Sequence, residues 1–102
     1  MALQLLRQDE IEAALGVLDP GWGGTPDALT RTIEFADFLT AVRFVDLLAP
    51  RCEEMDHHPD LRLRWRRVSL ELATHSLGGV THLDVRLAGI VDEVAEQLPL
   101  AS

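Results

Sequence analysis

Apolar residues recur three or four positions apart in three stretches of the chain, and this spacing predicts three amphipathic helices. The first should begin at Asp9, whose carboxylate can cap it, and end at Asp19-Pro20-Gly21. The third should follow Thr81-His82-Leu83-Asp84, which resembles a capping box, and end at Pro99. The second should follow a cap at Asp37, with an apolar stripe formed by Phe38, Val42, Val45 and Leu48.

A proline falls inside this second helix. Pro50 has no backbone N–H and its ring crowds the preceding turn, so we expect a kink there. The helix should resume through Cys52 and stop near His58, because Pro59 disfavours helical geometry at the residue before it.

Alternation of apolar and polar residues predicts the strands. Positions 29–35 alternate, except that Arg31 lies on the apolar face, where its charged group must reach solvent or an acidic partner. Trp22 to Pro26 includes two glycines and a proline, which favours only a weak strand.

The segment after Pro59 predicts a hairpin. Leu61, Leu63 and Trp65 alternate with arginines, and a second alternating set comprises Val68, Leu70 and Leu72. The two sets have opposite parity, so a tight turn at Arg66-Arg67 would put both on one face of a sheet.

The predicted element order is therefore α-β-β-α-β-β-α. It indicates an α+β fold, a small four-stranded antiparallel sheet with three helices on one face. Residues 1–102 have an even composition and a length typical of one domain, so we expect a single domain.

Charge and composition narrow the function. The net charge of −8 disfavours nucleic acid and anionic membranes as partners, since both need a basic surface. The apolar run before Arg7 is too short for a signal peptide, and no apolar stretch approaches the ~20 residues of a membrane span. The single cysteine, Cys52, cannot form an internal disulfide, which indicates a reducing compartment. We expect a cytoplasmic protein.

Candidate chemistry gathers around the histidines. Glu53 precedes His57 by one helical turn, His58 is adjacent, His75 follows the last strand and Asp84 lies in the first turn of the last helix. Three interpretations are open from the residues alone. The imidazoles could cap the end of the second helix, hold a metal, or transfer protons near neutral pH. Adjacent histidines are unfavourable ligands for one ion, and the usual zinc spacings are absent from the sequence.

The ordered set Glu53, His57-His58-Pro59, Trp65, His75 and Asp84 resembles the signature of the pterin-4a-carbinolamine dehydratase family. In that signature a glutamate lies four residues before His-His-Pro, an aromatic six after the proline, a histidine ten further on, and an aspartate closes the pattern. The segments at 21–22 and 27–38 are also similar to bacterial members, so the resemblance covers about positions 21 to 98.

The resemblance implies the same α+β fold and a specific activity. The expected reaction is dehydration of 4a-hydroxytetrahydrobiopterin to quinonoid dihydropterin in pterin recycling, without a cofactor or a metal. The roles that it implies are acid–base catalysis for His57 and His75, substrate binding for His58, Glu53 and Trp65, and control of an imidazole tautomer for Asp84.

Two further expectations concern partners. The edges of a small sheet are usually paired or covered, so we expect a homo-oligomer, a homodimer or homotetramer. An alternative to the enzyme is a catalytically silent, dimeric adaptor or a coactivator or assembly protein that retains the motif.

Leu61 departs from the family pattern, because many members have a tryptophan at this position.

Overall fold

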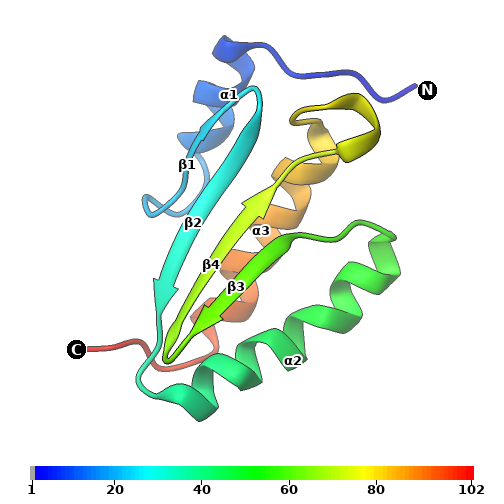
Figure 1. Cartoon of the computed structure of the whole chain (residues 1–102). Coiled ribbons are helices and arrows are strands. Elements are labelled where there is room, and N and C mark those ends of the chain that lie inside the picture. Colours follow the sequence, from blue (N-terminus) through cyan, green and yellow to red (C-terminus); the bar gives the residue numbers. More distant parts are fainter. Residues whose placement is uncertain (1) are drawn as a thin grey trace.

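The computed structural model describes residues 2–102 and confirms the predicted fold class. The elements are α1 (Gln8–Leu15), β1 (Gly23–Thr25), β2 (Ala28–Glu34), α2 (Phe38–Met55), β3 (Asp60–Arg64), β4 (Arg67–Leu72), a 3-10 turn η1 (His75–Leu77) and α3 (His82–Glu96). The strands form one antiparallel sheet in the order β1-β2-β4-β3, and the helices lie on one side of it (Figure 1). None of the helices in the described part of the chain is long and apolar enough to cross a membrane.

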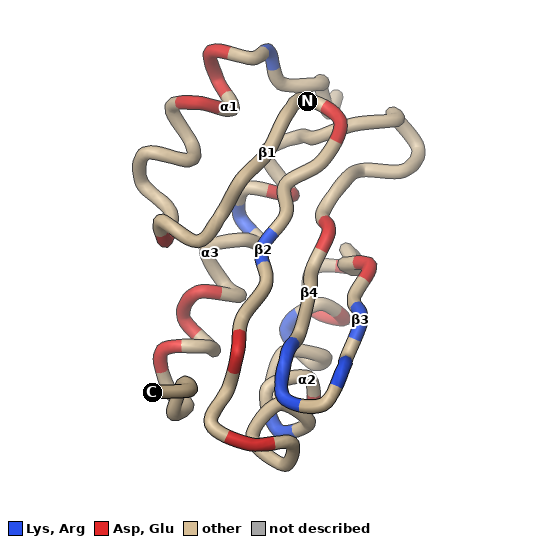
Figure 2. The backbone as a smooth tube through the Cα atoms, turned by 60° about the vertical axis from the view of Figure 1, so that its left-hand side comes forward, with Lys and Arg blue, Asp and Glu red and all other residues tan. Residues whose placement is uncertain are grey.

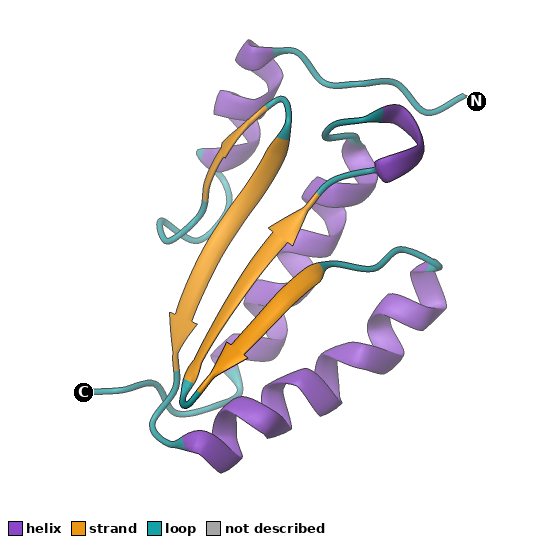
Figure 3. Cartoon of the chain, in the orientation of Figure 1, coloured by secondary structure: helices purple, strands orange, loops and turns teal. Residues whose placement is uncertain are grey.

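The sheet has two different faces because its side chains alternate. The helix side carries a buried apolar set made up of Leu29, Ile33, Val68, Leu70 and Leu72. The opposite side is free of helices (Figure 3), and its cross-strand rows are polar, such as Thr32, Ser69 and Arg62. Basic positions on β3 and β4 gather toward the turn that joins them (Figure 2).

The long helix α2 begins where the sequence predicted, since the Asp37 carboxylate accepts from the Thr40 N–H at 2.8 Å. Its buried stripe differs from the prediction. The residues that face the core are Ala41, Phe44, Leu48 and Cys52. Phe38 and Val42 are instead 49 % and 39 % exposed, because the helix turns Phe44 toward Phe35 of the core, with ring centroids 4.9 Å apart. The helix is continuous from Phe38 to Met55, with Pro50 inside it.

Two other local predictions need correction. The hairpin turn is Trp65-Arg66, one residue earlier than expected, because Arg64 pairs with Arg67; Trp65 has the left-handed φ of 53°. The residue preceding α1 is Arg7, whose N–H donates to the Glu10 carboxylate at 3.0 Å, so Asp9 lies in the first turn and does not cap the helix. Strand pairing moves the hairpin turn by one residue, and the local bond between Arg7 and Glu10 moves the start of α1 by two.

Arg31 finds the acidic partner that its position on the apolar face requires. Its side chain is only 9 % exposed and forms ion pairs with Asp92 of α3 and with Asp19. The Trp22 indole N–H donates to the same Asp92 carboxylate at 2.7 Å, and the Asp19 N–H donates to it at 3.0 Å. This network joins β2, α3 and the segment after α1.

Candidate active site

The three motif histidines, Glu53 and Asp84 lie where the end of α2, the start of β3, the turn η1 and the start of α3 meet. Asp56 ends α2 in the left-handed conformation, with φ 49° and ψ 43°, and its N–H bonds back to the carbonyls of Cys52 and Glu53. The two adjacent histidines that follow differ in burial. His57 is buried at 9 % exposure, whereas the His58 side chain is 54 % exposed.

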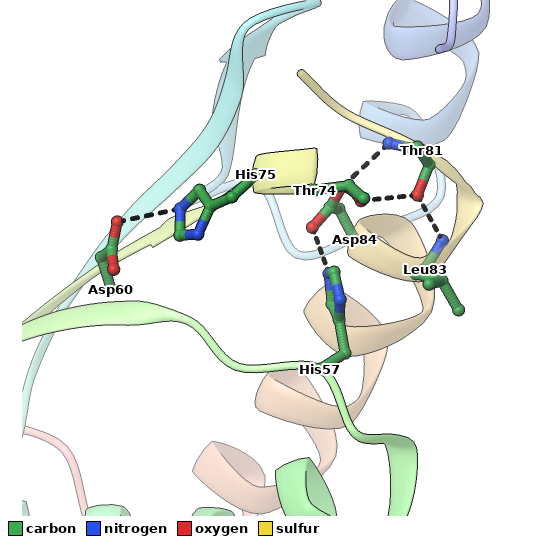
Figure 4. A network of polar contacts seen from close by, with 7 residues as sticks. All are labelled: His57, Asp60, Thr74, His75, Thr81, Leu83 and Asp84. Carbon is green, nitrogen blue, oxygen red and sulfur yellow. Dashed lines mark hydrogen bonds and ion pairs between the residues drawn. The ribbon is translucent and has the colours of Figure 1, made fainter. Parts of the chain in front are cut away.

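His57 contacts the carboxylate that begins α3. Its Nε2 lies 2.6 Å from Asp84 Oδ1, and Asp84 has no exposed surface (Figure 4). The other carboxylate oxygen, Oδ2, accepts from the Thr74 hydroxyl at 2.8 Å and from the Thr81 N–H at 2.9 Å. The contact with Thr81 is the capping box that the sequence predicted. Asp84 therefore caps α3 and binds His57 at the same time.

The other two motif histidines also have carboxylate partners, but both pairs are near the surface. His58 Nε2 contacts Glu53 Oε2, although the one-turn spacing in the sequence placed Glu53 beside His57, which pairs with Asp84 instead. His75 Nε2 lies 3.4 Å from Asp60 Oδ2, with side chains 70 % and 63 % exposed. Each motif histidine is thus paired with a separate carboxylate, and only the His57–Asp84 pair is withdrawn from solvent.

A cavity of about 280 Å³ lies beside His75. Residues from the β1–β2 turn, β3, β4 and the loop after η1 line it, including Asp27, Asp60, Glu71 and Gly79. A Cβ on Gly79 would lie 2.6 Å from the Pro26 carbonyl oxygen, so the close approach of these two loops requires glycine there. The lining includes three carboxylates and the His75 imidazole, so it offers several hydrogen-bonding groups.

The structure does not bring all the predicted site residues together. His57 points toward Asp84 and His75 points toward Asp60, on different sides of the segment that carries Thr74 (Figure 4). Trp65 lies in the hairpin turn, at the opposite end of β3 from Asp60. Five residues of strand separate the two ends, roughly 16 Å at the usual rise. Trp65 is 62 % exposed there, with the Arg66 guanidinium 4.3 Å above its ring.

Sequence reasoning missed three residues of this region, Asp60, Thr74 and Thr81. Asp60 directly follows the His-His-Pro motif and Thr74 directly precedes His75, so their nearness to the motif was a usable signal. Thr81 was identified only as a helix cap. His82, one residue further, is exposed and outside these contacts.

Two observations bear on the other chemistries considered for this cluster. Across residues 2–102, no group of three or more His, Cys, Asp or Glu side chains lies close enough together to hold a metal ion. The thiol of Cys52 is buried in the core, and burial, with a smaller contribution from the Glu53 charge, raises its pKa. A raised pKa keeps this cysteine in the unreactive thiol form.

Comparisons with known proteins converge on one family. The family model described as pterin 4 alpha carbinolamine dehydratase matches residues 4–94. A Mycobacterium sp. protein named "Putative pterin-4-alpha-carbinolamine dehydratase" is 40 % identical over 95 residues, which are 93 % of this chain and all of the relative. A relative of the same name from Koribacter versatilis is 43 % identical over 89 residues, covering 87 % of this chain and 94 % of its own.

Two solved structures are similar as well. A Brucella melitensis protein described as a transcriptional coactivator/pterin dehydratase superposes with a TM-score of 0.85 at 39 % identity, over 90 % of this chain and 99 % of that one. A pterin dehydratase-like protein identified as a RuBisCO assembly factor in the alpha-carboxysome gives a TM-score of 0.60 at 27 % identity, over 72 % of this chain and 86 % of that one.

Proposed function

The chain belongs to the pterin 4 alpha carbinolamine dehydratase family, and from this premise we propose that it is an active dehydratase. Its substrate would be a 4a-hydroxytetrahydropterin such as 4a-hydroxytetrahydrobiopterin, and its product the quinonoid dihydropterin. The observation that carries the proposal is the set of three imidazole–carboxylate pairs at one end of the β3–β4 hairpin, His57–Asp84, His58–Glu53 and His75–Asp60. A binding protein needs no such set, whereas acid–base chemistry does.

The reaction requires two proton movements. The bond between ring carbon 4a and its hydroxyl oxygen breaks as that oxygen takes up a proton, and water leaves. A ring nitrogen loses a proton, and its electrons form the new double bond. Imidazole groups can donate one proton and accept the other near neutral pH. We assign these two transfers to His57 and His75, and pterin binding to His58 and Glu53.

A dehydration assay on a synthetic 4a-hydroxytetrahydropterin tests the proposal. His57→Ala and His75→Ala should each lower kcat by about 10²–10⁴-fold, the usual contribution of a positioned acid or base. His58→Ala should mainly raise KM, because it removes binding rather than proton transfer. His82→Ala is the matched control and should change neither constant. Near-full turnover in both folded variants, His57→Ala and His75→Ala, would contradict the acid–base assignment.

The proposed mechanism uses no metal ion. Dialysis against a strong chelator should therefore leave the rate unchanged. A loss of activity that added zinc restores would assign the histidines to a metal site instead. Metal analysis of the purified protein provides an independent readout.

We also propose that the working form is a homodimer or homotetramer. Phe38, Leu39 and Val42 expose apolar surface on α2, and β3 is an unpaired edge of the sheet. A substrate-binding role for Trp65 requires such an assembly, because within one chain Trp65 is at the far end of β3. Light scattering at high protein concentration should give a multiple of 11.3 kDa, and a strict monomer would contradict this proposal. The free thiol of Cys52 fits a cytoplasmic location for this assembly.

An adaptor or assembly function is the second candidate. The exposed apolar residues of α2 favour it, since contiguous apolar surface often marks a protein interface. The descriptions of two similar structures, one as a coactivator and one as an assembly factor, also support this candidate. Absence of dehydration by the purified oligomer, with the fold intact, would favour this candidate over the enzyme.

A further inference from the structure

The hydroxyl groups beside the His57–Asp84 pair form a chain with one possible arrangement of protons. Thr74 Oγ1 lies 2.8 Å from Thr81 Oγ1 and 2.8 Å from Asp84 Oδ2, and Thr81 Oγ1 accepts from the Leu83 N–H at 3.3 Å (Figure 4). An ionised carboxylate can only accept, so the single hydroxyl proton of Thr74 points to Asp84. The Thr81 hydroxyl must then donate to Thr74.

The same reasoning fixes the proton on His57. Asp84 accepts from the Thr74 hydroxyl and the Thr81 N–H at Oδ2, and at Oδ1 it faces the imidazole. Because the carboxylate has no proton to give, His57 Nε2 must carry one and donate it. In this tautomer the lone pair of the ring is on Nδ1.

The free nitrogen of His57 reaches solvent. The one hydrogen bond of the His57 side chain among the described residues is that of Nε2. Nδ1 thus has no partner, yet it is not fully buried, because Arg66 Nε is the single fully buried side-chain nitrogen or oxygen among residues 2–102 that lacks a partner. Nδ1 therefore belongs to the tenth of the His57 side chain that remains exposed.

We propose that Thr74 is a positioning residue that, through Asp84, holds His57 as the Nε2–H tautomer, so that His57 takes up and releases protons through Nδ1. Thr74 is 5 % exposed and Asp84 is fully buried, so neither touches the substrate. Thr74 acts on the reaction only by keeping the carboxylate in place, and Thr81 orients Thr74 in turn. The kinetic consequence rests on the dehydratase activity proposed above, but the tautomer does not.

Nuclear magnetic resonance of the histidine side chains tests the tautomer without any assay. The wild-type protein should show a proton on His57 Nε2 that is shifted downfield by its carboxylate partner and exchanges slowly with water. Thr74→Val has nearly the same shape but no hydroxyl, and it should broaden or lose this signal. Thr74→Ser should keep it. Thr32→Val is the matched control, since it removes a hydrogen bond to Ser69 on the open face of the sheet.

The kinetic test uses the same variants. Thr74→Val should lower kcat by about tenfold with KM unchanged, in line with outer residues that orient a reactive group. Thr74→Ser should restore kcat, and Thr32→Val should match the wild type. Equal signals and rates in Thr74→Val and the wild type, or a proton on Nδ1 in the wild type, would overturn the inference. If Thr74→Val does not fold, the spectra of the wild type and of Thr74→Ser still show which nitrogen of His57 carries the proton. If His57 carries its proton on Nε2 but the protein does not dehydrate the pterin, only the proposed function is overturned.

Discussion

Helix α3 contributes two carboxylates to the interior, and they are arranged alike but suited to different tasks. Asp84, in its first turn, accepts from a hydroxyl, a backbone N–H and His57. Asp92, two turns further, accepts from the Trp22 indole, the Asp19 N–H and Arg31. Each joins α3 to strands or loops distant in sequence. In both cases three donors compensate for the loss of water around a carboxylate.

The partner makes the difference. Arginine stays charged at any pH that the protein encounters, so the Arg31–Asp92 pair can stabilise the fold but cannot exchange protons. Histidine changes its charge near neutral pH, and His57 has one nitrogen directed to Asp84 and the other exposed. The same helix therefore supports the fold through Asp92 and the proposed chemistry through Asp84. Substitutions at the two positions should have effects of different kinds.

The largest effect should follow Asp84→Asn. Asparagine can still accept from Thr81 and Thr74, but its amide NH₂ would face His57 and force the imidazole proton onto Nδ1. We expect kcat to fall by about 10²–10⁴-fold, as when the carboxylate that orients a catalytic histidine becomes an amide. Urea unfolding should show a smaller loss of stability, about 1–3 kcal/mol. A normal rate in folded Asp84→Asn would remove the distinction between the two carboxylates.

The next effect should follow Asp92→Ala, and it should concern stability alone. The substitution leaves the Arg31 guanidinium buried beside a single, more distant carboxylate, Asp19. Breaking a buried pair in this way typically costs about 3–5 kcal/mol. The rate per folded molecule should match the wild type. Glu93→Ala is the control, because Glu93 is also on α3 and its exposed pair with Arg51 of α2 should contribute no more than about 1 kcal/mol.

Features that depend on local chemistry were predictable from the sequence. Thr81 and Asp84 lie at capping-box spacing, and Asp37 precedes a helical pattern, so both caps were predicted correctly. The position of Arg31 on an apolar face also predicted an acidic partner. Which acid it meets depends on how α3 packs on β2, about 60 residues later, and periodicity contains no such information.

The errors have equally physical reasons. Both sides of α2 carry apolar residues, and the sheet decides that Phe44, rather than Val42, faces the core. Trp65-Arg66 is an unusual turn sequence, so the register of the hairpin came from strand pairing and not from turn chemistry. The site was predicted as one cluster of histidines. The structure instead gives each histidine its own carboxylate. Asp60 directly follows the His-His-Pro motif in the sequence, but its pairing with His75 became visible only in the structure.

The smallest effect concerns Cys52, which lies in the core at 3 % exposure. Its rate of alkylation can show how much substitution of either carboxylate loosens the fold. Because burial raises the pKa of its thiol, we expect slow alkylation by iodoacetamide at neutral pH, limited by opening of the fold. Alkylation should be faster in Asp92→Ala, which opens more often, and much less accelerated in Asp84→Asn. Mass spectrometry of the alkylated chain measures both rates. Equal acceleration in the two variants would mean that Asp84 supports the fold as much as Asp92 does.

The sign of the pH dependence follows from the same shift. A pKa that is raised in the folded state means that the folded protein holds the thiol proton more tightly than the unfolded chain does. The contribution of Cys52 to the free energy of unfolding is therefore fully retained below the pH range in which an unfolded cysteine titrates. Stability should then fall as the pH rises through that range toward the raised pKa. Cys52→Ala removes this dependence while it leaves the two carboxylates of α3 unchanged. Unfolding at pH 7 and at about pH 10 in the two proteins isolates the thiol, because other groups that titrate in this interval are common to both.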